Sequence, residues 1–195
     1  MNLPDTPLDI EPLSPKDLGD LEFALHNADL LGYSFVQRPE DVEHLLSELE
    51  ARHPHRLRGL VLKVETALAV GNLPELAVRA AGRWPTAIMI ARGDLAVELG
   101  YERLAEMQEE ILWLAEAASV PVIWATQVLD RLVKKGTPSR AEVSDAVLAA
   151  RAECVMLNKG PYLEQGIRVL TQVLRRMQDH QYKKTPKMRP LKAWS

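Results

Sequence analysis

Short apolar segments alternate with amphipathic segments along most of this chain, and no other feature of the sequence constrains the fold as strongly. Almost no polar residue interrupts the apolar segments, which is typical of strands buried on both faces of a parallel sheet. Buried strands that alternate with helices form an α/β fold in which helices cover the sheet. The sequence predicts about five βα units, with strands at 30–36, 59–66, 120–127 and 153–160 and, at 86–98, a strand leading into a loop.

The helices are predicted from capping residues and from apolar periodicity. Ser14 precedes Pro15, a combination of N-cap and first helical residue that marks a helix start. After Pro39, apolar residues recur at the spacing of one helix face. A third helix is expected from Pro74 to about Ala81. The remaining predictions are helices at 101–119, 140–152 and 161–181, with a loop before residue 140.

Several classes of protein are excluded by what the sequence lacks. Neither Gly-x-Gly-x-x-Gly nor a Walker A motif follows any predicted strand, so the common nucleotide-loop folds lose support. No apolar run approaches the roughly 18–20 residues that span a membrane, and the N-terminus has no signal-peptide pattern. The single cysteine, Cys154, cannot form an internal disulfide, which favours the cytoplasm; we expect it to be a small core residue.

The 195 residues suffice for one well-buried domain, and the charge is unevenly distributed along them. We expect an N-terminal extension at 1–13, a core at 14–178 and a basic C-terminal tail at 179–195. The stretch 175–195 contains seven Lys and Arg residues and one Asp. Aromatic residues do not interleave with these cations as in a single-strand binder, so we expect a frayed terminus and no nucleic acid.

Charged and polar side chains gather where the predicted strands end. Lys63 and Glu65 are two residues apart and so share one face of a strand, and Asp94 and Thr126 follow the next two strands. Carboxylates from neighbouring strand ends are typical Mg²⁺ ligands, and a lysine beside them neutralises charge on a phosphoryl group or an enolate. The backbone of Gly93 and Asp94 is suited to a carboxylate. The residues therefore indicate a metal and anion site.

Five segments resemble successive parts of one known family. LVLKVET, IMIARGDLAVE, VPVIWATQVLD, TPSRAEVSDAV and ECVMLN are similar in order and spacing to the second part of the pyruvate kinase (β/α)₈ barrel, and SFVQRPEDV resembles the part before it. The resemblance implies a partial TIM barrel of the phosphoenolpyruvate- and pyruvate-binding type. It also implies a truncated or split phosphotransferase of glycolysis that converts phosphoenolpyruvate and ADP to pyruvate and ATP. It implies that Lys63 and Thr126 are catalytic, and that Glu65 and Asp94 hold Mg²⁺ or Mn²⁺. Lys63, Gly93, Asp94 and Thr126 would bind the substrate.

Departures from the family pattern limit what the resemblance carries over. The first three barrel strands, with their K⁺ ligands, have no counterpart, and Asn158-Lys159-Gly160 replaces a turn near the nucleotide. The resemblance thus carries over metal and enolate chemistry, and it leaves the binding of ADP or ATP and of K⁺ open. The alternatives are an inactive barrel fragment that serves as an interaction protein and a metal-dependent aldolase or lyase of pyruvate enolate. Five strands leave two sheet edges, so self-association or a partner chain is expected.

Overall fold

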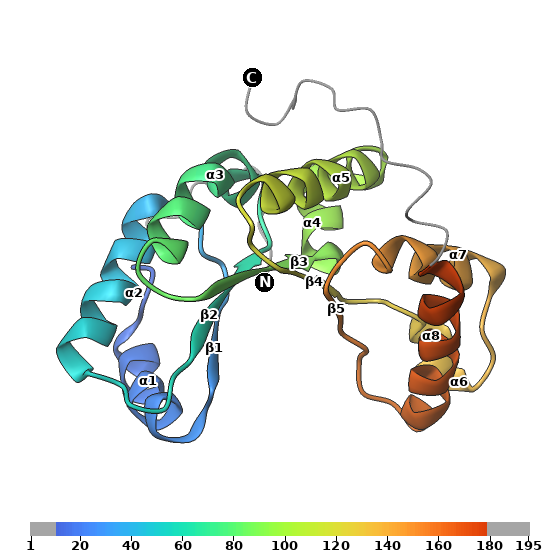
Figure 1. Cartoon of the computed structure of the whole chain (residues 1–195), viewed down its shortest axis with the longest axis horizontal. Helices are drawn as coiled ribbons and strands as arrows, with labels where there is room; N and C mark the ends of the chain where they lie inside the picture. The colour runs from blue at the N-terminus through green and yellow to red at the C-terminus, as the bar shows by residue number, and fades with distance from the viewer. Residues whose placement is uncertain (1–10, 179–195) are drawn as a thin grey trace.

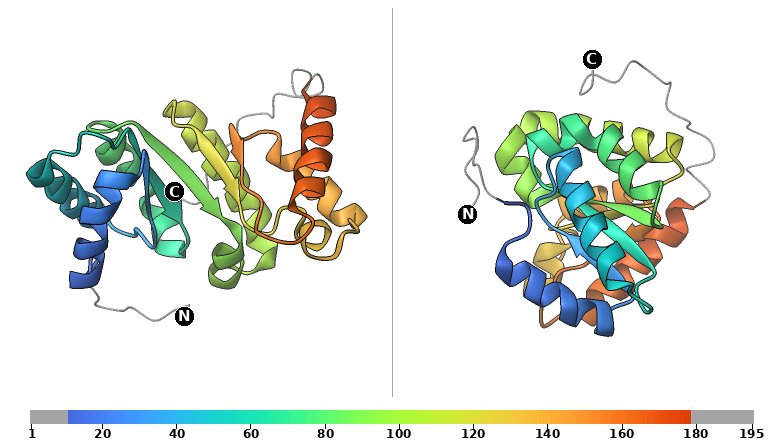
Figure 2. Two further views of the ribbon diagram at one scale, coloured as in Figure 1. Left: turned by 90° about the horizontal axis from the view of Figure 1, so that it is seen from below. Right: turned by 90° about the vertical axis from the view of Figure 1, so that its left-hand side faces the viewer.

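The computed structural model describes residues 11–178, which form one curved parallel sheet with helices on its outer side (Figure 1). The strand order β1-β2-β3-β4-β5 follows the chain, and each neighbouring pair is parallel. Seen from below in Figure 2, successive strands lie side by side in this order. The strands are β1 (Leu30–Tyr33), β2 (Gly59–Val64), β3 (Thr86–Ala91), β4 (Val122–Ala125) and β5 (Cys154–Val155).

Eight helices connect and cover these strands within the described part of the chain. Ser14 caps the first helix through a reciprocal bond with Asp17, as the Ser-Pro pair predicts. The helices are α1 (Pro15–Asn27), α2 (Pro39–Arg52), α3 (Ala67–Ala81), α4 (Arg92–Leu99), α5 (Tyr101–Ala117), α6 (Asp130–Lys135), α7 (Arg140–Ala149) and α8 (Leu163–Met177).

The two faces of the sheet have different surroundings. Leu62 and Val64 of β2 are fully buried, and they pack into clusters with helical residues. Side chains alternate along a strand, so Lys63 points to the opposite, concave face. It pairs in register with Met89, and on the helix-covered face Ile90 pairs with Trp124. Because all the strands are parallel, their carboxyl ends, which carry the polar residues, lie at the same end of the sheet.

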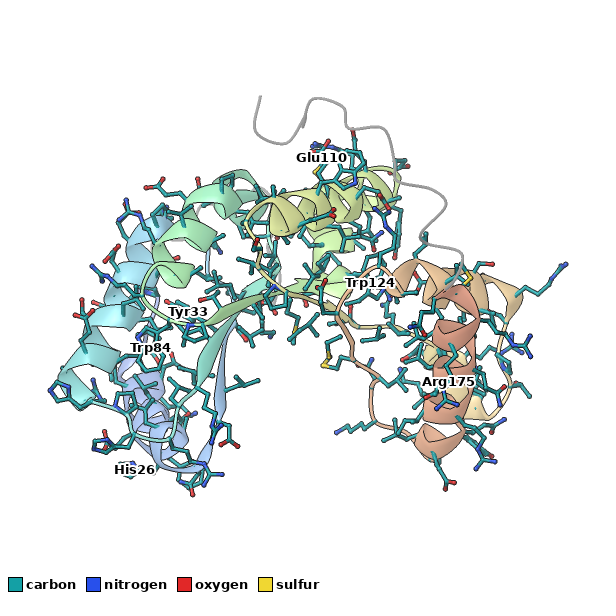
Figure 3. The ribbon with its side chains drawn as sticks, in the orientation of Figure 1. His26, Tyr33, Trp84, Glu110, Trp124 and Arg175 are labelled. Atoms are coloured by element: carbon teal, nitrogen blue, oxygen red, sulfur yellow. The ribbon has the colours of Figure 1, made fainter. Side chains whose placement is uncertain are left out.

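Two apolar clusters hold the helices on the convex face. The first joins α1 and α2 to β1 and β2, and the second joins α3 and the later helices to β3 and β4. Trp124, labelled in Figure 3, lies in the second cluster and is 1% exposed. These clusters fix the outer layer, and the strand ends that carry polar residues project from a rigid support.

Three elements correct the predictions made from sequence. Residues 92–99 form α4 directly after β3, so the expected strand leading into a loop over 86–98 is wrong beyond Ala91. Helix α3 begins at Ala67 and continues through Pro74, because burial of its apolar face outweighs the one backbone bond that proline removes. Six residues before Gly136 form α6, which is too short to show a clear periodicity.

The last strand is also shorter than predicted, and its cysteine is not in the core. β5 contains two residues, and Cys154 is exposed, which corrects the expectation of a buried core position. Val155 pairs with Trp124 on the helix-covered face, so Cys154 belongs to the concave face beside Ile123. Within residues 11–178 no helix covers that face, which explains the exposure.

The elements are arranged as an arch whose open side is the concave face of the sheet (Figure 1). Within residues 11–178, β1 and β5 each pair with a strand on one side only. None of the helices in this part of the chain is long and apolar enough to cross a membrane. The predicted tail at 179–195 and the first ten residues of the predicted extension lie outside the described residues.

Candidate functional site

The carboxyl end of β2 carries an ion pair with very different exposure of its two partners. Lys63 Nζ lies 2.9 Å from Glu65 Oε1, and the side chains are 27% and 3% exposed. The two residues are neighbours on one face because they are two positions apart at the end of an extended strand. A buried carboxylate needs a compensating partner, and the ammonium of Lys63 is that partner.

The loop after β1 supplies two further contacts that sequence reasoning missed. Lys63 Nζ donates a hydrogen bond to Ser34 Oγ at 2.6 Å, and the backbone N–H of Phe35 donates to Glu65 Oε2 at 2.5 Å. Phe35 has a φ of 53°, in the left-handed region that non-glycine residues rarely adopt. Both oxygens of Glu65 are thus engaged. Ser34 and Phe35 lie in the segment SFVQRPEDV, which resembles the family. The sequence of that segment alone does not show that its loop contacts the end of β2.

Asp94 lies in the first turn of α4, immediately after β3. Its side chain is half-buried and interacts with other groups of the protein. The positive end of the helix dipole favours a carboxylate at this position. Because β2 and β3 are adjacent and parallel, Asp94 and Glu65 both follow the carboxyl ends of neighbouring strands.

Thr126 follows β4 and is bonded to the segment that contains Asp94. The backbone N–H of Gly93 donates to Thr126 Oγ1 at 2.8 Å. A Cβ at Gly93 would lie 3.5 Å from that oxygen, an ordinary contact, so packing inside the chain does not by itself require glycine. The expected use of the Gly93 N–H for a substrate carboxylate competes with this hydrogen bond, and that role stays a prediction.

The fifth strand end is tied to α6 through Asn158 and not to the Lys63–Glu65 pair. Asn158 Nδ2 donates to Asp130 Oδ1 at 3.5 Å, and Lys134 Nζ lies 3.0 Å from the other oxygen of Asp130. Lys159 is exposed. A Cβ on Gly160 would lie 2.5 Å from the carbonyl oxygen of Val133, so close backbone approach requires glycine there.

The carboxylates of Glu65 and Asp94 are the groups that could hold a metal. Carboxylate oxygens suit Mg²⁺ and Mn²⁺, and the cation charge that Glu65 needs is supplied in this structure by Lys63. Residues 11–178 contain no group of three or more His, Cys, Asp or Glu side chains placed to hold a metal ion. A magnesium ion bound by one or two carboxylates, water and substrate oxygens needs no such group, so the donor set fits.

Fold and site together define a barrel-type α/β domain whose ionic side chains gather at the carboxyl edge of a parallel sheet. Its first 162 residues match the family model "Pyruvate kinase, barrel domain". The chain belongs to the pyruvate kinase family. Expectation and comparison therefore agree on the family and on the barrel-type fold.

Individual relatives give the same result over most of the chain. It is 35% identical to a pyruvate kinase of Agrobacterium vitis, over 93% of this chain and 38% of the relative. It is 33% identical to that of Thermococcus litoralis, over 100% and 40%, and 39% identical to that of Methylorubrum extorquens, over 81% and 32%. The chain thus spans about two fifths of the length of these curated relatives, or less.

Proposed function

We propose that this chain forms the part of a pyruvate kinase that binds a divalent metal and the enolpyruvate unit of phosphoenolpyruvate. The observation that carries the proposal is the contact between the Lys63 ammonium and the buried Glu65 carboxylate at the carboxyl end of β2. Active sites of βα barrels lie at this edge. The hydrogen bond from Gly93 to Thr126 links the next two strand ends at the same edge.

The proposed reaction breaks the bond between phosphorus and the enol oxygen and forms a bond between phosphorus and ADP. The enolate left behind takes a proton at its methylene carbon and becomes pyruvate. Lys63 stabilises negative charge on the phosphoryl group and on the enolate. Thr126 contacts the carbon that is protonated; the bond from Gly93 uses one lone pair of its hydroxyl and leaves the hydroxyl hydrogen.

In this proposal Glu65 and Asp94 hold Mg²⁺ or Mn²⁺. When bound, the metal supplies positive charge for the substrate's phosphate and enol oxygens. Glu65 would then hold the metal in place of its contact with Lys63, and the Phe35 N–H would keep its other oxygen in place. A reducing, cytoplasmic setting is part of the proposal, because Cys154 has no second cysteine to pair with.

The test is the binding of Mn²⁺, followed by paramagnetic resonance, to the whole chain and to a Glu65→Gln/Asp94→Asn variant. We expect the variant to lose at least about tenfold in affinity, or about 1.4 kcal/mol. Glu153→Gln is the matched control, because Glu153 lies at the opposite end of the sheet and binds the Val122 N–H. Equal affinity in wild type and double variant would overturn the proposed metal site.

Turnover of phosphoenolpyruvate and ADP by the isolated chain tests a separate point. We expect little activity, because five strands provide part of a barrel that has eight. Robust turnover that Lys63→Met abolishes would contradict this expectation. Intact Mn²⁺ binding without turnover matches the proposal, whereas absence of both favours an inactive fragment.

The concave face supports a further part of the proposal: additional parallel βα strands pair with the edges of this sheet. Leu30 of β1 is 59% exposed on this face, and Cys154 at the other edge is exposed too. In a closed barrel, layers of side chains from all strands fill this space. In the isolated chain, such strands come from a second copy, so self-association is expected.

Sedimentation over a range of concentrations tests this part. We expect association that Leu30→Lys weakens and that Phe23→Lys leaves unchanged, because Phe23 is 72% exposed on the outer helix α1. A monomer at every concentration, or equal effects of the two variants, would contradict the role of the concave face.

A further inference from the structure

Arg92 is a buried cation that has no place in the metal and anion site described above. It is the first residue of α4 and is 6% exposed. Burial of a guanidinium is costly unless its donors are bonded and its charge is paired. Arg92 meets both conditions with groups from β4, the loop after β4 and α7, and these contacts indicate what it holds in place.

Two of its donors bind the backbone at the end of β4. Nε donates to the carbonyl oxygen of Ala125 at 3.0 Å, and NH2 donates to that of Thr126 at 2.5 Å. Thr126 and Gln127 have φ values of 62° and 57°. Such a conformation is rare for a β-branched residue such as Thr126, so it persists only where surrounding groups hold it. The guanidinium of Arg92 is one of those groups.

The residue next to Arg92 holds the side chain of the same threonine. Gly93 N–H donates to Thr126 Oγ1, so the carbonyl and the hydroxyl of Thr126 are bonded to two consecutive residues. The Thr126 side chain can then rotate little about χ1 without breaking the hydrogen bond from the Gly93 N–H. Arg92 and Gly93 together fix both the backbone and the rotamer of Thr126.

The other side of the guanidinium is fixed by α7 and by an aromatic ring. NH1 lies 2.5 Å from Asp145 Oδ1 of α7, and the guanidinium carbon lies 4.9 Å from the centre of the Trp124 ring. The start of α7 is itself anchored, because the Glu142 carboxylate accepts hydrogen bonds from the backbone N–H groups of Ser139, the N-cap residue, and of Arg131 in α6. The segment TPSRAEVSDAV thereby holds the Asp145 carboxylate as a fixed negative charge beside the guanidinium of Arg92.

We propose that Arg92 is a positioning residue for Thr126, with Asp145 as the group that orients it. Asp145 orients the guanidinium, the guanidinium holds the strained backbone of Thr126, and the Thr126 hydroxyl is directed toward the carboxyl edge of the sheet. The step at the substrate rests on the proposed function, in which Thr126 acts at the carbon that is protonated. The positioning of Thr126 itself does not depend on that function.

The test compares Arg92→Met with wild type by magnetic resonance of threonine methyl groups and by amide exchange of Gly93. We expect the coupling constants of Thr126 to change from those of one rotamer to an average over several, and the Gly93 amide to exchange at least about tenfold faster. Asp145→Asn, which keeps the shape and removes the charge, should give a smaller change in the same direction. These readouts need neither metal nor turnover.

Arg151→Met is the matched control for a merely structural effect. Arg151 is also an arginine in an ion pair, with Glu109, but it is only partly buried and contacts a different region. We expect it to lower stability without changing Thr126 or Gly93. An unchanged rotamer in Arg92→Met, or the same change in both variants, would overturn the proposal. If Arg92→Met does not fold, Asp145→Asn and Thr126→Ser supply the comparison, and Thr126→Ser should keep Gly93 protected.

A second arm measures exchange of the methyl protons of pyruvate with water in the presence of Mg²⁺. In this exchange a C–H bond breaks, its proton passes to water, and the enolate regains a proton. We expect Arg92→Met to lower kcat at least about tenfold and to leave KM for pyruvate within about twofold. Loss of pyruvate affinity with kcat unchanged would refute positioning. Absence of exchange in wild type would count against the proposed function only, since the rotamer and amide readouts test positioning independently.

Discussion

Replacement of Lys63 by methionine separates the two roles of the ammonium at the carboxyl end of β2. The substitution keeps the length of the side chain and removes the charge 2.9 Å from Glu65 Oε1. The Glu65 side chain is 3% exposed, so water cannot replace the lost partner without opening the site. Removing one member of a buried pair costs about 3–5 kcal/mol. Because Lys63 is itself 27% exposed, we expect a loss of about 2–3 kcal/mol of unfolding free energy.

Thermal unfolding measures this loss directly. For a chain of this size each kcal/mol shifts Tm by about 2–4 °C, so the expected fall is about 4–12 °C. Mn²⁺ should bind the variant more tightly than wild type, by about tenfold, because it no longer competes with an ammonium for Oε1 of Glu65. Added Mn²⁺ should therefore raise the Tm of Lys63→Met more than that of wild type.

Two variants make the reasoning refutable. Lys159→Met removes an exposed lysine at another strand end and should change neither Tm nor Mn²⁺ affinity. Lys63→Met/Glu65→Gln replaces the orphaned carboxylate by a neutral amide and should recover much of the lost stability. Unchanged or weaker Mn²⁺ binding in Lys63→Met would show that the ammonium does not compete with the metal, and an unchanged Tm would show that it does not stabilise Glu65.

Three further outcomes follow from other parts of the structure. Burial raises the pKa of Tyr33 above its ordinary value of 10.0. The stability that the neutral phenol contributes is therefore complete below pH 10.0 and is lost as the pH rises above it. In urea unfolding at alkaline pH, Tyr33→Phe should reduce the fall of the unfolding free energy by up to about 1.4 kcal/mol per pH unit. Tyr101→Phe, at an 82% exposed site, should leave that fall unchanged. Ser139→Ala should cost about 1 kcal/mol by removing the α7 cap, whereas the exposed Ser144→Ala should cost less than half of that in chemical unfolding. Leu73→Ala should cost about 2–5 kcal/mol, because Leu73 is fully buried; a loss below 1 kcal/mol in the same assay would contradict its place in the core.

The family and the βα order could be predicted from sequence because both depend on local patterns. Strands that are apolar on both faces predict a parallel sheet, and the structure has one. Ser14 and Ser139 each cap a helix through a bond to a residue three positions away, which is visible in sequence. The pair Lys63 and Glu65 was predictable for the same reason, since residues two apart on a strand share a face.

Elements that depend on distant contacts were predicted less well. Thr66 caps α3 at its start. Because the apolar face of α3 is buried, the helix continues through Pro74. The apolar strand predicts a buried Cys154, yet the residue is exposed, because none of the helices of residues 11–178 covers its side of the sheet. Whether an apolar residue is buried depends on what lies opposite it, and a strand pattern does not contain that information.

The sequence by itself determined which chemical groups stand at the strand ends: an ammonium, two carboxylates and a hydroxyl, at positions recognisable as those of one family. The tertiary structure decided which groups hold them. Ser34 and Phe35 reach Lys63 and Glu65 across about thirty residues, and Asp145 reaches Arg92 across more than fifty. These partners are set by strand pairing and helix packing, which bring together residues whose separation along the chain carries no periodic signal.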